Sequence, residues 1–140
     1  MARDTSKKRK LRRVLLVEDD AVLALTLEGA LLDAGADEVV ICSTMAATVV
    51  ELERNPPDTI ILDVHLADRD DGWALAEVVS LLGPNRPRIA FATGSAADIP
   101  PAVKAMGPVF EKPYDPQQVA EVLLSEKKTG LFARIRGALG

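Results

Sequence analysis

Short apolar runs alternate along the chain with segments in which apolar residues recur every three or four positions. The first run, residues 14–17, ends abruptly in acidic residues, and such a run indicates a strand buried on both faces. The next segment carries Leu23, Leu27 and Leu31 at helical spacing until Gly35, a residue typical of a helix end. The chain therefore begins with one strand and one helix.

The same unit is repeated. After the second run, Ser43 or Thr44 is placed to cap a helix that carries Ala47, Val50 and Leu52. Proline residues then end this helix. Further strands are predicted by the apolar runs at residues 39–41, 59–62, 89–92 and 109–110.

Two later helices are clear and one is doubtful. Residues 74–82 and 117–124 have helical spacing of their apolar positions. The segment 96–106 is interrupted by Pro100 and Pro101, and proline inside a helix removes a hydrogen bond and clashes with the preceding turn. A regular helix between the fourth and fifth strands is therefore not assured.

Strands that alternate with helices predict an α/β fold, a five-stranded parallel sheet with helices on both faces in three layers. We assign residues 12–126 to one such domain. Residues 1–11 are expected to form a basic flexible arm, and residues 127–140 a short amphipathic basic tail.

Composition fits one soluble domain: the 140 residues are 48% apolar and 27% charged. No apolar run approaches the roughly 20 residues that span a bilayer, and the charged start does not resemble a signal peptide. We therefore expect a cytoplasmic protein without a membrane span. The single cysteine, Cys42, lies among apolar residues and is expected to be a small buried hydrophobic residue.

The net charge of −4 is unevenly distributed. Residues 1–13 hold seven basic residues against Asp4, a net charge of +6, so the remainder carries −10. An arm of this kind could contact nucleic acid or an anionic membrane. It contains no aromatic residue for base stacking, so we expect a solvated lead-in and no nucleic-acid partner.

Polar residues follow the apolar runs at the points where the predicted strands end. In open parallel sheets, ligands bind outside these carboxyl ends. Three carboxylates, a hydroxyl and an ammonium are thus expected at one edge. In chain order, the residues at the strand ends are Glu18, Asp19 and Asp20, then Asp63, then Thr93 and Gly94, then Lys112 and Pro113.

This set of groups suits phosphoryl chemistry. Glu18, Asp19 and Asp63 would repel one another unless a cation were present, and hard oxygen ligands favour Mg²⁺ over zinc. The ammonium of Lys112 and the hydroxyl of Thr93 could then bind phosphoryl oxygens. Asp63 is left as the nucleophile that would carry the phosphoryl group.

From about residue 12 to residue 125, the chain resembles the receiver domains of two-component systems, the CheY-like family. The resemblance implies the strand order 2-1-3-4-5. It also implies that Asp63 is the phosphoacceptor and that Thr93 and Lys112 bind the phosphoryl oxygens. The implied Mg²⁺ ligands are Asp19 and Asp63, which bind the ion directly, and the backbone carbonyl of His65. Glu18 would bind the ion through water. The matching motifs are Val17-Glu18-Asp19-Asp20, Leu62-Asp63-Val64, Ala92-Thr93-Gly94 and Lys112-Pro113.

The segment Phe91-Ala92-Thr93-Gly94 is also similar to a subgroup of single-domain receivers named for this motif. That subgroup is typical of alphaproteobacteria and often serves in phosphorelays or general stress signalling. Ser95 stands where its members usually carry a bulkier residue.

The resemblance implies a single-domain response regulator that accepts a phosphoryl group from a histidine kinase or a histidine phosphotransfer protein. It would signal through an unknown downstream protein as a monomer or weak dimer, and catalyse only its own phosphoryl transfer and slow dephosphorylation. The alternatives are a phosphate sink and a receiver-like scaffold that works without phosphorylation. A phosphatase of the haloacid dehalogenase class is disfavoured, since His65 stands where that class has its second acid.

Overall fold

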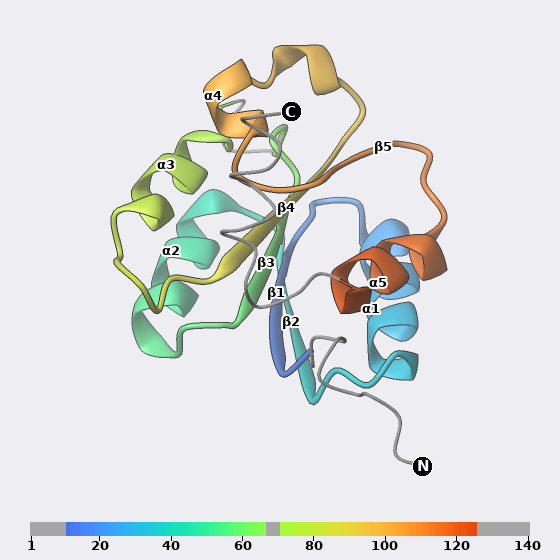
Figure 1. Cartoon of the computed structure of the whole chain (residues 1–140). Helices are drawn as coiled ribbons and strands as arrows, with labels where there is room; N and C mark the ends of the chain where they lie inside the picture. The colour runs from blue at the N-terminus through green and yellow to red at the C-terminus, as the bar shows by residue number, and fades with distance from the viewer. Residues whose placement is uncertain (1–10, 67–70, 126–140) are drawn as a thin grey trace.

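The structure is a computed structural model that describes residues 11–66 and 71–125. Five parallel strands form one sheet in the order β2-β1-β3-β4-β5 (Figure 1). The predicted α/β class and the strand order 2-1-3-4-5 are therefore confirmed. The strands are β1 (Arg13–Val17), β2 (Glu38–Cys42), β3 (Thr59–Leu62), β4 (Arg88–Thr93) and β5 (Val109–Glu111).

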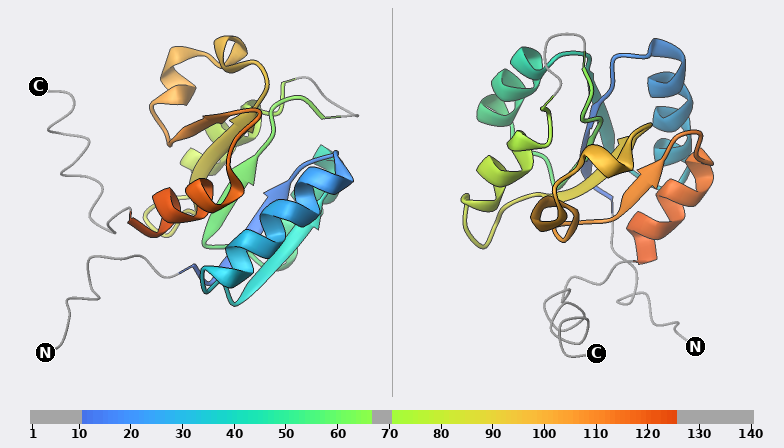
Figure 2. Two further views of the ribbon diagram at one scale, coloured as in Figure 1. Left: turned by 90° about the vertical axis from the view of Figure 1, so that its right-hand side faces the viewer. Right: turned by 90° about the horizontal axis from the view of Figure 1, so that it is seen from above.

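Helices cover both faces of the sheet, as the two views in Figure 2 show. Helices α1 and α5 lie side by side on one face, and α2 and α3 cover the other (Figure 1). The helices are α1 (Ala21–Asp33), α2 (Met45–Arg54), α3 (Ala74–Ser80), α4 (Pro101–Lys104) and α5 (Pro116–Ser125), with a 3₁₀ helix, η2 (Ala96–Asp98), before α4.

Strand β1 shows why a continuous apolar run is needed at the centre of this sheet. Leu15 and Val17 belong to the core on the α2–α3 side. Val14 and Leu16 belong to the core on the α1–α5 side. All four residues are at most 1% exposed, because successive side chains of a strand point to opposite faces. The run predicted as a strand buried on both faces is confirmed.

Local signals set the helix ends. The carboxylate of Asp20 accepts hydrogen bonds from the backbone N–H groups of Val22 and Leu23 and so caps α1. Of the two candidate caps for α2, the structure uses Thr44, whose hydroxyl accepts from the Ala47 N–H. Gly35 has a φ of 109°, which explains why a glycine follows α1.

The inward faces of α2 and α3 differ from the apolar spacing seen in the sequence. In α2 the buried residues are Met45 and Thr48, whereas Val50 is 58% exposed. After α3, Leu82 lies beyond the helix end and is 57% exposed, and Val78 also faces solvent. Helix α3 instead buries Leu75, Ala76 and Val79.

The doubtful segment before β5 is short and irregular. It contains the three-residue η2 and the four-residue α4, in which Pro101 occupies the first turn. Proline is tolerated there because its missing N–H would have no partner in the helix. Ile99 and Val103 are buried in the core on the α2–α3 side.

The ends of the chain lie largely outside the described residues, including the predicted basic tail and all of the predicted arm except Leu11. Leu11 is 1% exposed and packs in the core on the α1–α5 side. Cys42 is buried, as predicted. Within the described part of the chain, no helix has the length and apolar character required to cross a bilayer.

Candidate functional site

Backbone hydrogen bonds hold the strand ends in register at one edge of the sheet. The N–H of Asp63 donates to the Val17 carbonyl at 3.0 Å, which places β3 beside the end of β1. The N–H of Lys112 donates to the Thr93 carbonyl at 2.9 Å, which places the residue after β5 beside the end of β4. The side chains that follow these strands therefore meet at the same edge, toward the top of Figure 1.

Lys112 joins two of the predicted site residues. Its Nζ atom lies 2.8 Å from Oε1 of Glu18 and 2.9 Å from Oδ2 of Asp63. The side chains of Glu18 and Asp63 are 2% and 5% exposed, and that of Lys112 is 21% exposed. A buried carboxylate requires a charge partner or several hydrogen bonds. Lys112 gives Glu18 and Asp63 a positive charge and a hydrogen-bond donor.

The acidic residues form a compact cluster. One carboxylate oxygen of each of Glu18, Asp19 and Asp63 lies within 4.8 Å of the other two. Asp19 is exposed, so the cluster is open to solvent on one side. Hard oxygen ligands with room for water suit Mg²⁺. The donor set present therefore fits the predicted cation.

Burial and charge act together on the ionisation of this cluster. Burial raises the pKa of the Glu18 carboxyl, and the charge of Asp63 acts in the same direction, while hydrogen bonds from Lys112 and Asp20 oppose it. Burial alone would lower the pKa of Lys112, but its hydrogen bonds to Asp63 and Glu18 raise it above the usual value. Lys112 is therefore a permanent cation at neutral pH.

The remaining hydrogen bonds orient the acidic and hydroxyl groups. Oδ1 of Asp63 accepts from the His65 N–H at 3.0 Å. Oγ1 of Thr93, which is fully buried, accepts from the Ser95 N–H at 3.1 Å. Its O–H remains available as a donor, because a hydroxyl can donate and accept at once. A phosphoryl oxygen is a hydrogen-bond acceptor and requires such a donor.

Two residues of the strand ends have roles that the sequence did not specify. Asp20 is the cap of α1, and its N–H donates to Oε2 of Glu18 at 3.1 Å, so its carboxylate is outside the acidic cluster. The side chain of His65 contacts Asp98 in η2, with Nε2 3.1 Å from Oδ2. The structure thus links the residues after β3 to the irregular segment after β4.

Sequence reasoning assigned no role to the side chain of Tyr114, which follows the Lys112-Pro113 pair. Its hydroxyl oxygen is buried, and no hydrogen-bond partner is present among the described residues. Its ring packs against the core on the α1–α5 side. A lone tyrosine in a sequence gives no signal that separates a packed ring from a hydroxyl that serves a site.

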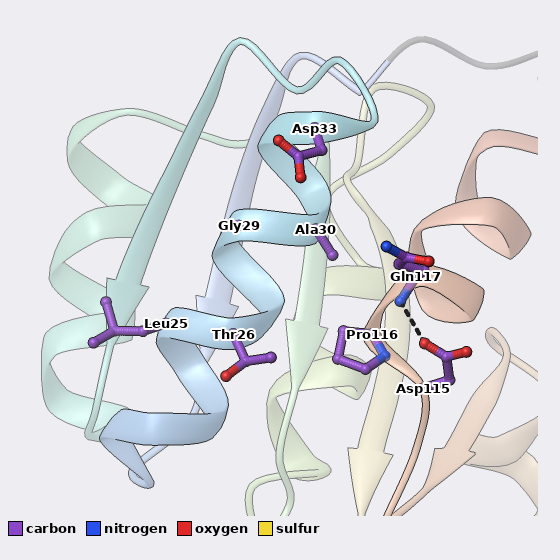
Figure 3. A pocket seen from close by; sticks show the side chains of 8 residues that line it. All are labelled: Leu25, Thr26, Gly29, Ala30, Asp33, Asp115, Pro116 and Gln117. Carbon is purple, nitrogen blue, oxygen red and sulfur yellow. Dashed lines mark hydrogen bonds between the residues drawn. The ribbon is translucent and has the colours of Figure 1, made fainter.

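A separate cavity lies between α1 and the start of α5 (Figure 3). None of the predicted site residues lines it. Leu25 and Thr26 of α1 form one wall, and Asp115 and Gln117 form the opposite one (Figure 3). Asp115 accepts a hydrogen bond from the Gln117 N–H at 3.0 Å and so helps begin α5. The cavity is therefore lined by other residues than the acidic cluster.

Comparison of the sequence with protein families agrees with this fold and with the cluster of acids around Lys112. Residues 14–124 match the model of the response regulator receiver domain. The chain belongs to this family. A receiver domain is the signal-accepting module of a response regulator, which places the chain in two-component signalling. A comparison with curated proteins finds no match.

Solved receiver structures share the fold at low sequence identity. A CheY-like receiver domain from Methanospirillum hungatei JF-1 is 24% identical, with a TM-score of 0.71, over 91% of this chain and 99% of that one. A receiver domain from Methylobacillus flagellatus is 21% identical, with a TM-score of 0.70, over 81% and 97% of the two chains. The response regulatory domain of protein mrkE from Klebsiella pneumoniae is 22% identical, with a TM-score of 0.67, over 89% and 98%.

Proposed function

We propose that this receiver domain is a phosphorylation switch that accepts a phosphoryl group on Asp63 from a histidine kinase or a histidine phosphotransfer protein. The observation that carries the proposal is the contact of Lys112 with both Glu18 and Asp63 beside the exposed Asp19. An ammonium and a cluster of hard oxygen ligands at one strand edge would neutralise the charge of an incoming phosphoryl group.

In the proposed transfer, a carboxylate oxygen of Asp63 attacks the phosphorus of a phosphohistidine. The oxygen–phosphorus bond forms as the nitrogen–phosphorus bond breaks, and the imidazole leaves with the electron pair of the broken bond. Lys112 pairs with one phosphoryl oxygen and the Thr93 hydroxyl donates to another. The product is an acyl phosphate, which water hydrolyses back to the carboxylate.

We assign Mg²⁺ as the cofactor. Asp19 and Asp63 would hold it directly, Glu18 would hold it through water, and the backbone carbonyl of His65 would complete the protein ligands. Bound Mg²⁺ supplies positive charge that offsets the repulsion between the acids and the phosphoryl oxygens.

A protein donor must approach Asp63 over the carboxyl edge of the sheet. Helix α1 begins at this edge, directly after Asp19 and Asp20. Val22 and Leu25 on its first two turns are 74% and 61% exposed, and exposed apolar side chains beside a polar site favour protein contact. We propose that this end of α1 receives the donor.

We propose that the phosphorylated domain changes its affinity for a downstream protein. The alternative of a phosphate sink uses the same chemistry without that partner. The alternative of a scaffold that works without phosphorylation is disfavoured by the buried Glu18 and Asp63, because buried acids are costly to maintain without a function.

The test is intact-mass measurement after incubation with a panel of phosphorylated histidine kinases or with acetyl phosphate, in the presence of Mg²⁺. Wild type is expected to gain the mass of one phosphoryl group, and Asp63→Asn to gain none. A wild-type protein that no donor labels, although it is folded, would favour the scaffold alternative. Labelling of Asp63→Asn as fast as wild type would show that another residue is the acceptor.

A further inference from the structure

Helices α2 and α3 lie side by side on one face of the sheet and expose apolar side chains (Figure 1). A groove of about 270 Å³ lies between them, with Val49 on one wall and Val78 on the other. The Leu81 N–H donates to the Val78 carbonyl, so the turn after α3 extends this surface. A contiguous exposed apolar surface is typical of a docking site. The exposed apolar residues of this surface, here called the α2–α3 surface, are Val49, Val50, Val78, Leu81 and Leu82, with exposed fractions between 43% and 83%.

The end of α5 lies at the same edge of the sheet as the end of α3. Nη1 of Arg88, the first residue of β4, donates to the Leu123 carbonyl in the last turn of α5 at 2.9 Å. Residues 81–87 join α3 to Arg88. The chain therefore leaves α5 at the edge where Leu81 and Leu82 are exposed.

The sequence beyond α5 carries apolar positions that match such a surface. They recur at the three- and four-residue spacing that places side chains on one face of a helix. Residues 126–130 separate this stretch from α5 and can span roughly 17 Å when extended. A helical segment could therefore reach the α2–α3 surface. The apolar positions are Leu131, Phe132, Ile135 and Leu139.

Charge favours the domain itself as the partner of this segment. The basic tail, residues 127–140, holds four basic residues and no acid, a charge of +4. The whole chain carries −4 and residues 1–13 carry +6, so residues 14–126 carry −14. Helices α2 and α3 contribute three glutamates and one arginine to that charge. A cationic amphipathic segment is therefore attracted to this side of the domain.

We propose that residues 131–139 of the basic tail dock as an amphipathic helix on the α2–α3 surface of their own domain. The apolar positions of the tail cover Val78, Leu81 and Leu82, and its basic positions face the acids of α2 and α3. Docking removes both apolar faces from water, which is the main favourable contribution to such a contact. The inference goes beyond the proposed phosphorylation of Asp63 and does not depend on it.

The tail of the same chain is favoured over other occupants of the surface. A short flexible linker gives the tail an effective concentration on the order of millimolar at its own domain. The tail of a second copy matches this only in a protein solution of similar concentration. A membrane with anionic lipids would attract the tail but repel a domain with a charge of −14.

Paramagnetic broadening of amide signals in the full chain tests the docking. Thr129→Cys provides a thiol for a nitroxide label beside the docking segment, and Cys42 is only 6% exposed, so it should not react. We expect the amide signals of Val78 and Leu81 to lose intensity relative to a sample in which ascorbate has reduced the nitroxide. The signal of Val22, in α1 on the opposite face of the sheet, should keep its intensity.

Two variants of the labelled chain should abolish the intensity loss at Leu81. Val78→Glu places a charge in the docked surface at a position that is 58% exposed, and Ile135→Ser removes an apolar group from the tail. Leu32→Glu is the matched control, because Leu32 is a 45% exposed residue of α1 on the other face. It should leave the intensity loss unchanged. The positions of the remaining amide signals check that each variant is folded.

Undiminished signals at Val78 and Leu81 in the labelled chain would overturn the proposal and leave the α2–α3 surface to another protein. Intensity loss that persists in both Val78→Glu and Ile135→Ser would also contradict it, since the approach of the label would not depend on the apolar contact. A mixture of isotope-labelled protein without nitroxide and nitroxide-labelled protein at natural isotope abundance separates one chain from two. We expect no intensity loss in the mixture, and an equal loss there would assign the surface to the tail of a second copy.

Discussion

The Nζ atom of Lys112 lies 2.8 Å from Oε1 of Glu18, so the residue after β5 is paired with the residue after β1 although β3 and β4 lie between these strands. The same Nζ contacts Asp63. The ammonium therefore holds two buried acids together. A phosphoryl group on Asp63 would compete for this ammonium, which gives phosphorylation a direct means of rearranging the site.

Replacing Lys112 with methionine should destabilise the protein most when no divalent cation is present. The buried carboxylates of Glu18 and Asp63 would then repel each other without a counter-charge, a loss of about 1–3 kcal/mol for a partly exposed cation. Mg²⁺ should restore part of that loss. Urea unfolding in EDTA and in Mg²⁺ measures both effects.

Lys104→Met is the control, because Lys104 is exposed at the end of α4. It should unfold like the wild type in both buffers. Equal stability of Lys112→Met and the wild type in EDTA would mean that the observed contacts do not stabilise the site.

The affinity for Mg²⁺ should fall as the pH is lowered. The fall should begin at a higher pH than the protonation of a glutamate with the usual pKa would cause. Burial raises the pKa of Glu18, so a proton competes with the cation earlier on acidification. The raised pKa also means that folding favours the protonated acid. Its ionisation therefore costs stability as the pH rises through that pKa, and the cost disappears on acidification.

Calorimetric titration of Mg²⁺ at a series of pH values measures this dependence. Glu18→Gln cannot ionise at this position and should have a weaker pH dependence over the same range. The same dependence in the variant and in the wild type would assign the proton to another group.

A charge on the first turns of α1 should slow phosphorylation by protein donors but not phosphorylation by small-molecule donors. Leu25→Glu is expected to slow phosphorylation by a histidine kinase or phosphotransfer protein at least about tenfold, the cost of an unpaired charge in an interface core. Phosphorylation by acetyl phosphate should be unchanged. Leu81→Glu, at an 83% exposed position after α3, is the control and should affect neither reaction. Equal slowing with both donors would indicate damage to the site itself.

Two glycines should respond in opposite directions to the same substitution. A Cβ at Gly107 would lie 1.8 Å from the Ile89 carbonyl oxygen, whereas a Cβ at Gly29 meets nothing within 4 Å. Gly107→Ala should lower the free energy of unfolding by more than about 2 kcal/mol, since backbone must move. Gly29→Ala, in the middle of α1, should raise it by about 0.5–1 kcal/mol. Denaturant unfolding measures both, and a neutral Gly107→Ala would contradict the close packing of β4 against residue 107.

The fold was predictable because its central strands are apolar without interruption. Residues 14–17 and 60–62 pack on both faces of the sheet, so their uninterrupted apolar character specifies their position in the fold. The surfaces of α2 and α3 were harder to predict. Val50 and Val78 are both 58% exposed, because the rotation of a short helix is decided by the residues that contact the sheet and not by its mean apolar content.

The candidate site was predictable to the extent that strand ends share one edge. Asp63 and Lys112 are 49 residues apart in the sequence, but they follow strands whose carboxyl ends lie at the same edge of the sheet. The contact between His65 and Asp98, and the buried hydroxyl of Tyr114, depend on loop paths and side-chain directions. No spacing in the sequence encodes these.

The central claim is that Asp63 carries the phosphoryl group. Borohydride reduces an acyl phosphate of aspartate to homoserine, so treatment after incubation with acetyl phosphate and Mg²⁺, followed by peptide mass spectrometry, locates the acceptor. We predict homoserine at position 63, and none when EDTA replaces Mg²⁺. Homoserine at another aspartate with position 63 unmodified, or no reduction product in protein that is demonstrably folded, would contradict the account.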